Sequence, residues 1–166
     1  MAVWLRYLTM FGLAMVPVSE LRGAIPLGIL AYDIPWYECY ILCCIANFIP
    51  VPFILLLIKK VIKWMGESKV EFFKKVSLWI QNKADKNKDK INRYGVFGLI
   101  LFVAIPLPMT GAWTGALVAA VTNMKFGRAV ICCITGILIA GAIVTLISTG
   151  ALSALDWMLG SKLNVA

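Results

Sequence analysis

Long apolar runs alternate in this chain with short interruptions that contain proline, glycine and hydroxyl residues. A helix that spans a membrane needs about 20 apolar residues. Two runs, 36–58 and 129–149, reach that length, whereas 2–16, 94–105 and 112–121 are shorter. We therefore predict two spanning helices and several helical arms that enter the bilayer without crossing it.

Two of the interruptions resemble each other. The first, 17–26, reads Pro-Val-Ser-Glu-Leu-Arg-Gly-Ala-Ile-Pro, and the second, 106–115, reads Pro-Leu-Pro-Met-Thr-Gly-Ala-Trp-Thr-Gly. Non-helical backbone at membrane depth is tolerated only where protein buries it or water reaches it, and paired interruptions in matching halves are typical of transporter sites. We predict two re-entrant hairpins that face each other across a site. The residues expected to break the helices are Pro17, Pro26, Pro106 and Pro108.

The order of interruption, short arm and spanning helix occurs twice, which indicates an internal repeat. An offset of 89 residues pairs Pro17 with Pro106 and the dipeptide Cys43-Cys44 with Cys132-Cys133. Few other identities accompany these, so the matched order is the better evidence. The predicted fold is an all-α integral membrane domain over 1–166 with an inverted repeat. Its parts are repeat 1 (1–58), a basic connector (59–93), repeat 2 (94–149) and a C-terminal tail (150–166).

The composition supports a membrane protein and argues against an enzyme. Of the 166 residues, 61% are hydrophobic and 14% charged, and the mean hydropathy is +0.89, more apolar surface than a soluble core absorbs. There is no histidine, so the usual general base and metal ligand are missing. The five cysteines lack Cys-x-x-Cys spacing and are interpreted as packing residues. We expect no enzymatic activity, no cofactor and no metal.

The positive charge is concentrated in the connector. Eleven of the sixteen lysines and arginines and four acidic residues lie in 59–93, so this segment carries +7 of the net +8. By the positive-inside rule it is cytoplasmic, in a protein of the prokaryotic plasma membrane with both termini outside. A basic helix beside a membrane binds anionic lipid far more often than nucleic acid, so we expect membrane lipids as partners and no nucleic acid. The pattern predicts an amphipathic helix over 69–82 and a solvated connector over 84–92.

Glu20 and Arg22 are the charged residues predicted to lie deep in the membrane. A charge at the bilayer centre costs about 2.5–3.5 kcal/mol, and such residues are functional hypotheses by default. Desolvated Glu20 could carry a proton, and Arg22 could bind a phosphate or carboxylate. Ser19 adds a hydroxyl beside them. The alternative is that both charges are hydrated residues of a loop nearer the surface.

The second interruption offers polar groups without charge. Thr110 or Gly111 can begin the returning half-helix, whose N-terminal N–H groups then point into the site. Thr114 lies one turn after Thr110 on the same face. Trp113 combines an indole donor with an apolar surface that suits an amphiphile, although ordinary packing explains it equally well.

Residues 20–28 and 106–117 resemble the two signature stretches of the putative small multi-drug export protein family, which is grouped with the DedA (VTT-like) superfamily. The resemblance covers nearly the whole chain and implies two opposed re-entrant loops and a role in membrane transport. DedA proteins are associated with lipid movement and typically carry arginines around the proline of the second loop. Here Val103 and Met109 occupy those places, so Arg22, Lys125 or Arg128 would have to substitute.

The expected function is therefore a membrane transporter of the small multidrug export type that moves an amphiphilic small molecule or lipid, with proton coupling. Two alternatives remain open. One is a DedA-like flippase or scramblase for phospholipid or polyprenyl phosphate. The other is a membrane structural or insertion factor that transports nothing. The small size of the chain favours a homodimer.

Overall fold

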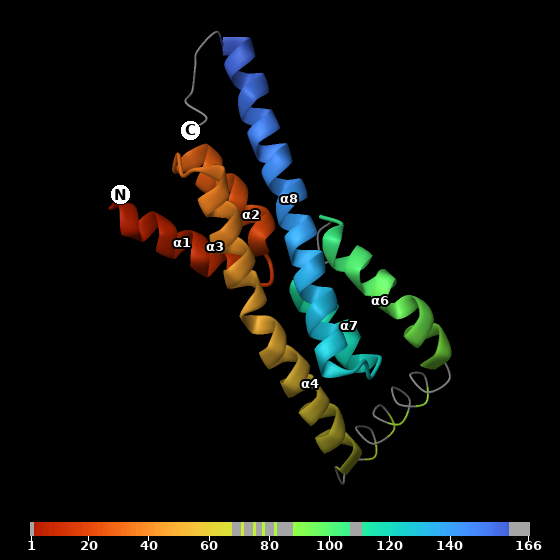
Figure 1. Cartoon of the computed structure of the whole chain (residues 1–166). Coiled ribbons are helices and arrows are strands. Elements are labelled where there is room, and N and C mark those ends of the chain that lie inside the picture. Colours follow the sequence, from red (N-terminus) through yellow and green to blue (C-terminus); the bar gives the residue numbers. More distant parts are fainter. Residues whose placement is uncertain are drawn as a thin grey trace.

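The computed structural model describes residues 2–67, 88–106 and 111–159, together with positions 71, 75, 78 and 82. These residues form helices and no strands, which confirms the predicted all-α class (Figure 1). The elements are α1 (Val3–Met15), α2 (Glu20–Pro26), the π-helical η1 (Leu27–Ala31), α3 (Trp36–Phe48), α4 (Pro50–Glu67), α6 (Lys88–Ala104), α7 (Ala112–Val121) and α8 (Phe126–Leu159).

Two helical stretches are long and apolar enough to cross a membrane, Trp36–Trp64 and Phe126–Gly150. They contain the predicted spans 36–58 and 129–149 and extend them. In Figure 1, α3 and α4 run in the opposite direction to α8 along the length of the molecule. Large apolar side chains are exposed on the outside of the molecule, where lipid would cover them. Examples are Phe53, Phe97 and Leu146.

Prolines divide the first long stretch into two helices. α3 ends at Phe48 and α4 begins at Pro50, with Ile49 as the turn residue between them. Proline has no backbone N–H, so Pro50 cannot close the usual helical hydrogen bond to the residue four positions earlier. The predicted single helix over 36–58 is therefore interrupted near its centre.

Each half of the chain also contributes a helical hairpin. The first hairpin consists of α1, α2 and η1, and the second hairpin consists of α6 and α7; within each, the arms pack against each other. The short arms agree with the predicted runs 2–16, 94–105 and 112–121 to within a few residues, except that α6 begins earlier, at Lys88. Part of the predicted connector 84–92 is thus helical, and the predicted tail 150–166 begins as the last turns of α8.

The first interruption is shorter than predicted, and Pro26 does not break the chain. Only residues 16–19 are non-helical, because α2 already begins at Glu20. Pro26 lies inside the helix, which continues through η1 with π winding. A proline ring clashes with the carbonyl four residues earlier, and the wider π turn accommodates it. Pro17 and Pro106 do lie in non-helical backbone, whereas Pro108 and most of the predicted helix 69–82 lie outside the described residues.

The elements of the two halves correspond along the chain. An offset of 89 residues places α1 on α6, α2 with η1 on α7, and α3 with α4 on α8. The second arm of each hairpin ends near a residue with positive φ. These residues are Asp33 (50°) after η1 and Asn123 (54°) after α7, and aspartate and asparagine tolerate this conformation. In space α2 packs on α8 and α7 packs on α4. Each hairpin therefore packs against the long helix of the other half.

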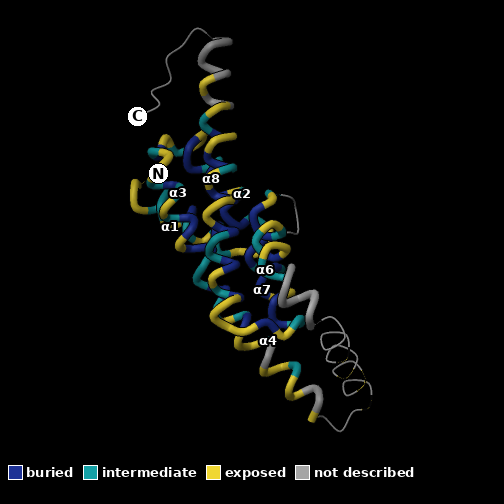
Figure 2. Tube along the Cα trace, turned by 45° about the vertical axis from the view of Figure 1, so that its right-hand side comes forward, coloured by how far each residue is buried: buried dark blue, intermediate teal, exposed yellow. Residues whose placement is uncertain are grey.

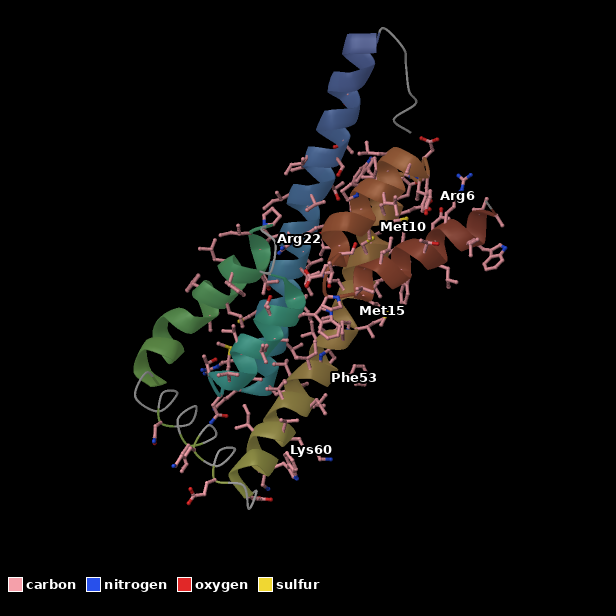
Figure 3. The ribbon with its side chains drawn as sticks, turned by 180° about the vertical axis from the view of Figure 1, so that it is seen from behind. Arg6, Met10, Met15, Arg22, Phe53 and Lys60 are labelled. Atoms are coloured by element: carbon pink, nitrogen blue, oxygen red, sulfur yellow. The ribbon has the colours of Figure 1, made fainter. Side chains whose placement is uncertain are left out.

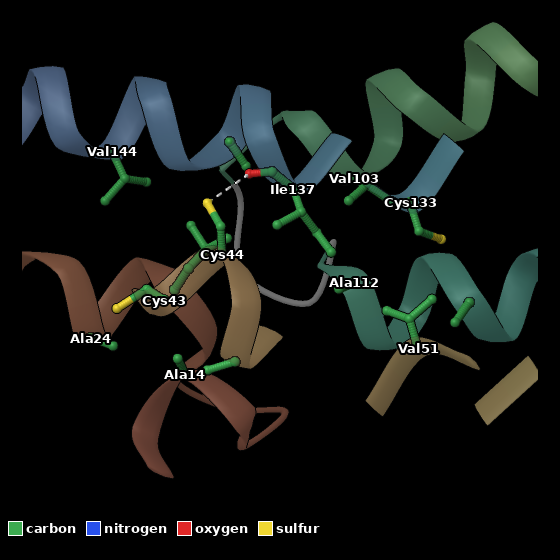
Figure 4. Packing of buried hydrophobic residues seen from close by; sticks show 14 of the residues in the cluster. Ala14, Ala24, Cys43, Cys44, Val51, Val103, Ala112, Cys133, Ile137 and Val144 are labelled. Carbon is green, nitrogen blue, oxygen red and sulfur yellow. Dashed lines mark hydrogen bonds between the residues drawn. The ribbon is translucent and has the colours of Figure 1, made fainter. Parts of the chain in front are cut away.

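Buried residues gather at the centre of the molecule (Figure 2), and more than half of the buried hydrophobic residues are alanine or cysteine. Ala14 and Ala24 of the first hairpin and Cys43 of α3 form part of one buried cluster (Figure 4). A Cβ at Gly136 of α8 would lie 2.6 Å from Cβ of Val103 in α6, so glycine permits this approach. All five cysteines are buried and free, as the interpretation as packing residues requires.

Candidate functional site

The tips of the two hairpins meet at a partly open cavity of about 620 Å³, called here the hairpin cavity. Its walls come from both interruptions and from the first turns of α2 and α7. The lining residues are Pro17, Val18, Ser19, Glu20, Arg22, Gly23, Pro106, Gly111, Trp113 and Thr114. Residues about 90 positions apart in the sequence are thus brought to one place.

Glu20 lies at the contact between the hairpins. Its side chain is only 5% exposed and its carboxylate is pressed against Gly111, where a Cβ would collide with it. The backbone N–H of Trp113 points at Glu20 Oε1 at 3.5 Å. The carboxylate therefore sits at the N-terminus of α7, where backbone N–H groups and the helix dipole favour negative charge.

The local environment of Glu20 opposes its ionisation. Burial raises the pKa of the carboxyl from its ordinary value, and nearby Arg22 and the N–H groups of Trp113 and Ala112 lower it only in part. The backbone of Glu20 also has a positive φ of 49°, which is unfavourable for a residue with a side chain. A strained, buried carboxyl that binds its proton more tightly than usual is suited to proton transfer.

Two hydrogen bonds, which together we call the clasp, connect the hairpins in both directions. Arg22 Nη2 of the first hairpin donates to the carbonyl of Ile105, just after α6, at 3.1 Å. Trp113 Nε1 of the second hairpin donates to the carbonyl of Met15, the last residue of α1, at 3.0 Å. Figure 3 shows Arg22 reaching toward the end of α6. Carbonyls at helix ends lack helical partners, so each hairpin supplies a donor that the other one needs.

The hydroxyl residues have different roles. Thr114 caps its own helix: the N–H of Gly111 donates to Thr114 Oγ1 at 2.9 Å, and the Thr114 hydroxyl lies 3.3 Å from the Gly111 carbonyl. Ser19 precedes α2 and makes no capping bond through its side chain. Its hydroxyl faces Gly23, where a Cβ would collide with it. Thr114 thus fixes the start of α7, and Ser19 adds a polar group to the wall.

The hairpin cavity is lined by most of the residues that were predicted for the site. Their roles in binding stay predictions. Ser19, Glu20, Arg22, Gly111, Trp113 and Thr114 gather there with Pro17 and Pro106. Pro26 is not part of the wall, and Thr110 and Pro108 lie outside the described residues. Among the described residues, no group of three or more histidine, cysteine or acidic side chains is placed to hold a metal ion.

Two features of the structure were not predicted from the sequence. The clasp depends on which carbonyl each donor reaches, and no local pattern indicates this. Asn47 of α3 is 1% exposed, and its side-chain oxygen has no hydrogen-bond partner among the described residues. A signal for Asn47 did exist, because it is the only side-chain amide in the apolar run 36–58.

A family model described as "Putative small multi-drug export protein" matches residues 20–143, which include the second interruption, the first interruption from Glu20 onward and most of both halves. No curated protein and no solved structure matches the chain.

Proposed function

Because this chain belongs to the putative small multi-drug export protein family, we propose that it is a membrane transporter that carries an amphiphilic small molecule through the hairpin cavity. The observation that carries this proposal is the convergence of both interruptions on one cavity of about 620 Å³. That volume is in the range of sites for small organic ligands, about 300–1,000 Å³. Glu20 and Arg22 offer charged groups to a polar end, and Trp113 offers a surface to an apolar end.

We further propose that the two hairpins are re-entrant and that the halves form an inverted repeat. The corresponding order of elements and the reciprocal packing of α2 on α8 and α7 on α4 support this. In Figure 1 the first hairpin and the second hairpin open toward opposite ends of the molecule. Alternating access would then arise when one hairpin moves against the other around the cavity.

Glu20 is the proposed coupling group. When ionised, its carboxylate is held by the N-terminus of α7. When protonated, it loses most of that attraction, so the contact at Gly111 loosens and the cavity can open on one side. The raised pKa of Glu20 means that protonation occurs at a higher pH than for a free glutamate. Proton binding and the contact between the hairpins are thereby coupled.

The orientation follows from charge. We propose that the basic segment 59–93 faces the cytoplasm of a prokaryotic cell and that the protein lies in the plasma membrane. Lys125 and Arg128, which are exposed at the start of α8, agree with this because they place further positive charge on the same side.

The proposal is tested by transport into proteoliposomes, with and without a pH gradient. The substrates are a panel of cationic drugs, anionic amphiphiles, phospholipids and polyprenyl phosphates. Glu20→Gln keeps shape and hydrogen bonding but cannot release a proton, so we expect it to abolish the dependence on the gradient. Lys60→Gln, an exposed charge change on α4, is the matched control and should transport as the parent does.

Arg22→Lys distinguishes the substrate charge. A guanidinium binds phosphate or carboxylate through two parallel hydrogen bonds and an ammonium does not, so an anionic substrate should lose about tenfold or more in transport. A cationic substrate should lose little, because Glu20 would be its counter-ion. If Glu20→Gln and Arg22→Lys both leave every substrate unaffected, the hairpin cavity is not the transport site.

One observation favours a flippase as a second candidate. Val18, in the wall of the hairpin cavity, is 93% exposed, so an apolar side chain stands at the opening, where lipid tails could pass. Transfer of a fluorescent phospholipid between leaflets without drug uptake would support this reading. Full biological activity of the double variant Glu20→Gln, Arg22→Gln would instead favour a membrane factor that does not transport.

A further inference from the structure

The N-terminus of α7 already holds one anion, the carboxylate of Glu20. A Cβ at Gly111 would collide with both carboxylate oxygens, so the carboxylate lies directly over this residue. The backbone N–H groups of Ala112 and Trp113 are directed at it, the latter at 3.5 Å from Oε1. The first turn of this ten-residue helix therefore forms a place for an anion, which we call the α7 anion site.

The α7 anion site borders the hairpin cavity. Glu20, Gly111 and Trp113 all line the cavity, so both the site and its occupant are next to the space of about 620 Å³. Arg22 lines the same cavity, and its positive charge acts on Glu20. These two are the charged side chains among the described lining residues. Without the negative charge of Glu20, the wall is therefore positive.

The environment of Glu20 is unsuitable for binding a cation. The side chain is 5% exposed, and its carboxylate faces the N–H groups of α7. A cation brought to this carboxylate would approach both Arg22 and the positive end of the helix dipole. A protonated Glu20, in contrast, leaves these N–H groups and Arg22 without an anion. Such a set of groups binds carboxylate, phosphate or sulfonate.

We propose that Glu20 is a tethered anion that occupies the α7 anion site, and that the anionic group of the substrate, a carboxylate or a phosphate, takes its place when Glu20 is protonated. This rests on the proposed function, because it assigns an anionic group to the carried amphiphile. Each bound anion is accompanied by one proton that Glu20 takes up from water, so the net charge at the site stays the same.

The exchange makes anion binding depend on pH. Burial raises the pKa of Glu20, and Arg22 is the charged side chain that shifts it in the opposite direction. Helix α2 packs against α1, α3 and α8, whose described charged side chains are Arg6, Glu38 and Arg128. The shift comes from none of these, nor from the tyrosines and cysteines of these helices. Below the pKa of Glu20 the affinity for an anion is constant, and above it the affinity falls about tenfold per pH unit.

The test uses octane-1-sulfonate, a probe that stays ionised throughout the range of about pH 5 to pH 9. The full chain is placed in phosphatidylcholine nanodiscs, and empty nanodiscs supply the blank. Calorimetric titration in two buffers with different heats of ionisation gives both Kd and the number of protons taken up. For the parent we expect uptake of about one proton per anion above the pKa of Glu20 and a Kd that rises about tenfold per pH unit there.

Three variants locate the effect. Glu20→Gln cannot ionise, so its Kd should be the same at every pH, without proton uptake, and below that of the parent at high pH. Arg22→Gln should raise Kd about tenfold or more, because the anion loses a charged partner. Lys60→Gln removes an exposed positive charge on α4 and should bind as the parent does. Octanoate and octyl phosphate, compared at one pH, show which anionic group binds more tightly.

Two results would overturn the proposal. One is a parent Kd that does not change with pH and is accompanied by no proton uptake, which needs no variant. The other is tight binding of octyltrimethylammonium that Glu20→Gln abolishes, since Glu20 would then be the counter-ion of a cation. Binding at equilibrium requires no transport. Proton-linked anion binding in a chain that transports nothing would therefore contradict only the transport proposal, and gradient-driven transport with pH-independent anion binding would contradict only the exchange.

Discussion

Gly111 is the residue on which the contact between the hairpins depends. Its φ of −109° is accessible to any residue, so the glycine is not needed for the backbone conformation. It is needed because the carboxylate of Glu20 occupies the space of a Cβ. A side chain at this position would therefore act on Glu20 and leave the course of the chain unchanged.

We predict that Gly111→Ala displaces the Glu20 carboxylate from the N-terminus of α7 while the protein stays folded. Loss of a charge-assisted hydrogen bond corresponds to a fall of about tenfold or more in gradient-dependent transport. Adding Glu20→Gln to this variant should cause little further loss, because both changes remove the same contact.

Gly98→Ala provides the control for that prediction. No atom lies within 4 Å of a Cβ at Gly98 in α6, so alanine is accommodated and should stabilise the helix by about 0.4–1 kcal/mol. Transport should be unchanged. Additive losses in the Gly111→Ala, Glu20→Gln double variant would show that Gly111 and Glu20 act independently.

At the scale of the elements, the clasp explains how two short hairpins are held tip to tip. Helix α1 has 13 residues and the apolar part of α6 runs only over Gly95–Ala104, both too short to span a bilayer, so each helix ends near the centre of the molecule. A carbonyl at such an end has no water to bind in a membrane. Arg22 and Trp113 each donate to such a carbonyl from the opposite hairpin.

We predict that Trp113→Phe, which removes the indole N–H but keeps a ring, destabilises the protein by about 1–3 kcal/mol, because the Met15 carbonyl loses its donor. For a chain of this size that corresponds to a fall in Tm of roughly 2–12 °C in a thermal-shift measurement. Trp4→Phe is the comparison, since Trp4 is 67% exposed on α1, and it should change Tm little. Equal Tm values for both variants would contradict a stabilising role of the indole bond.

For the molecule as a whole, we propose that charge sets the orientation of the long helices in the membrane. The connector 59–93 carries +7 and joins the end of α4 to the second hairpin. Because α3–α4 and α8 run in opposite directions, a cytoplasmic connector places the first hairpin on the outer side and the second hairpin on the inner side. The hairpin cavity then lies between the two surfaces.

We predict that a cysteine introduced as Asn87→Cys, in a chain whose native cysteines are replaced, reacts with a membrane-impermeant thiol reagent only in inverted vesicles or lysed cells. A cysteine added after Ala166 should react from outside intact cells, because both termini are expected there. Labelling of Asn87→Cys from the outside of intact cells would reverse the orientation and exchange the roles of the two hairpins.

The helical class, the long helices and the short arms could all be predicted from the sequence. These depend on local hydrophobic runs and on proline and glycine, whose effects extend over a few residues. The sequence also indicated Glu20, Arg22, Gly111, Trp113 and Thr114 as one set, since polar groups within apolar runs are conspicuous. The effects of the prolines were less well predicted. Pro26 was expected to break a helix but is accommodated by a π turn, and Pro50 separates α3 from α4 although the apolar run 36–58 predicted one continuous helix.

How those residues meet could not be predicted from the sequence and depends on the packing of the helices. The contact of Glu20 with Gly111, the two donors of the clasp and the hairpin cavity all join residues far apart in the chain. Such contacts depend on how closely helices approach and on which turn faces which, and apolar patterns do not contain this information. In a membrane, where lipid is as apolar as the helix surfaces, the positions of small residues and buried polar groups determine how the helices pack.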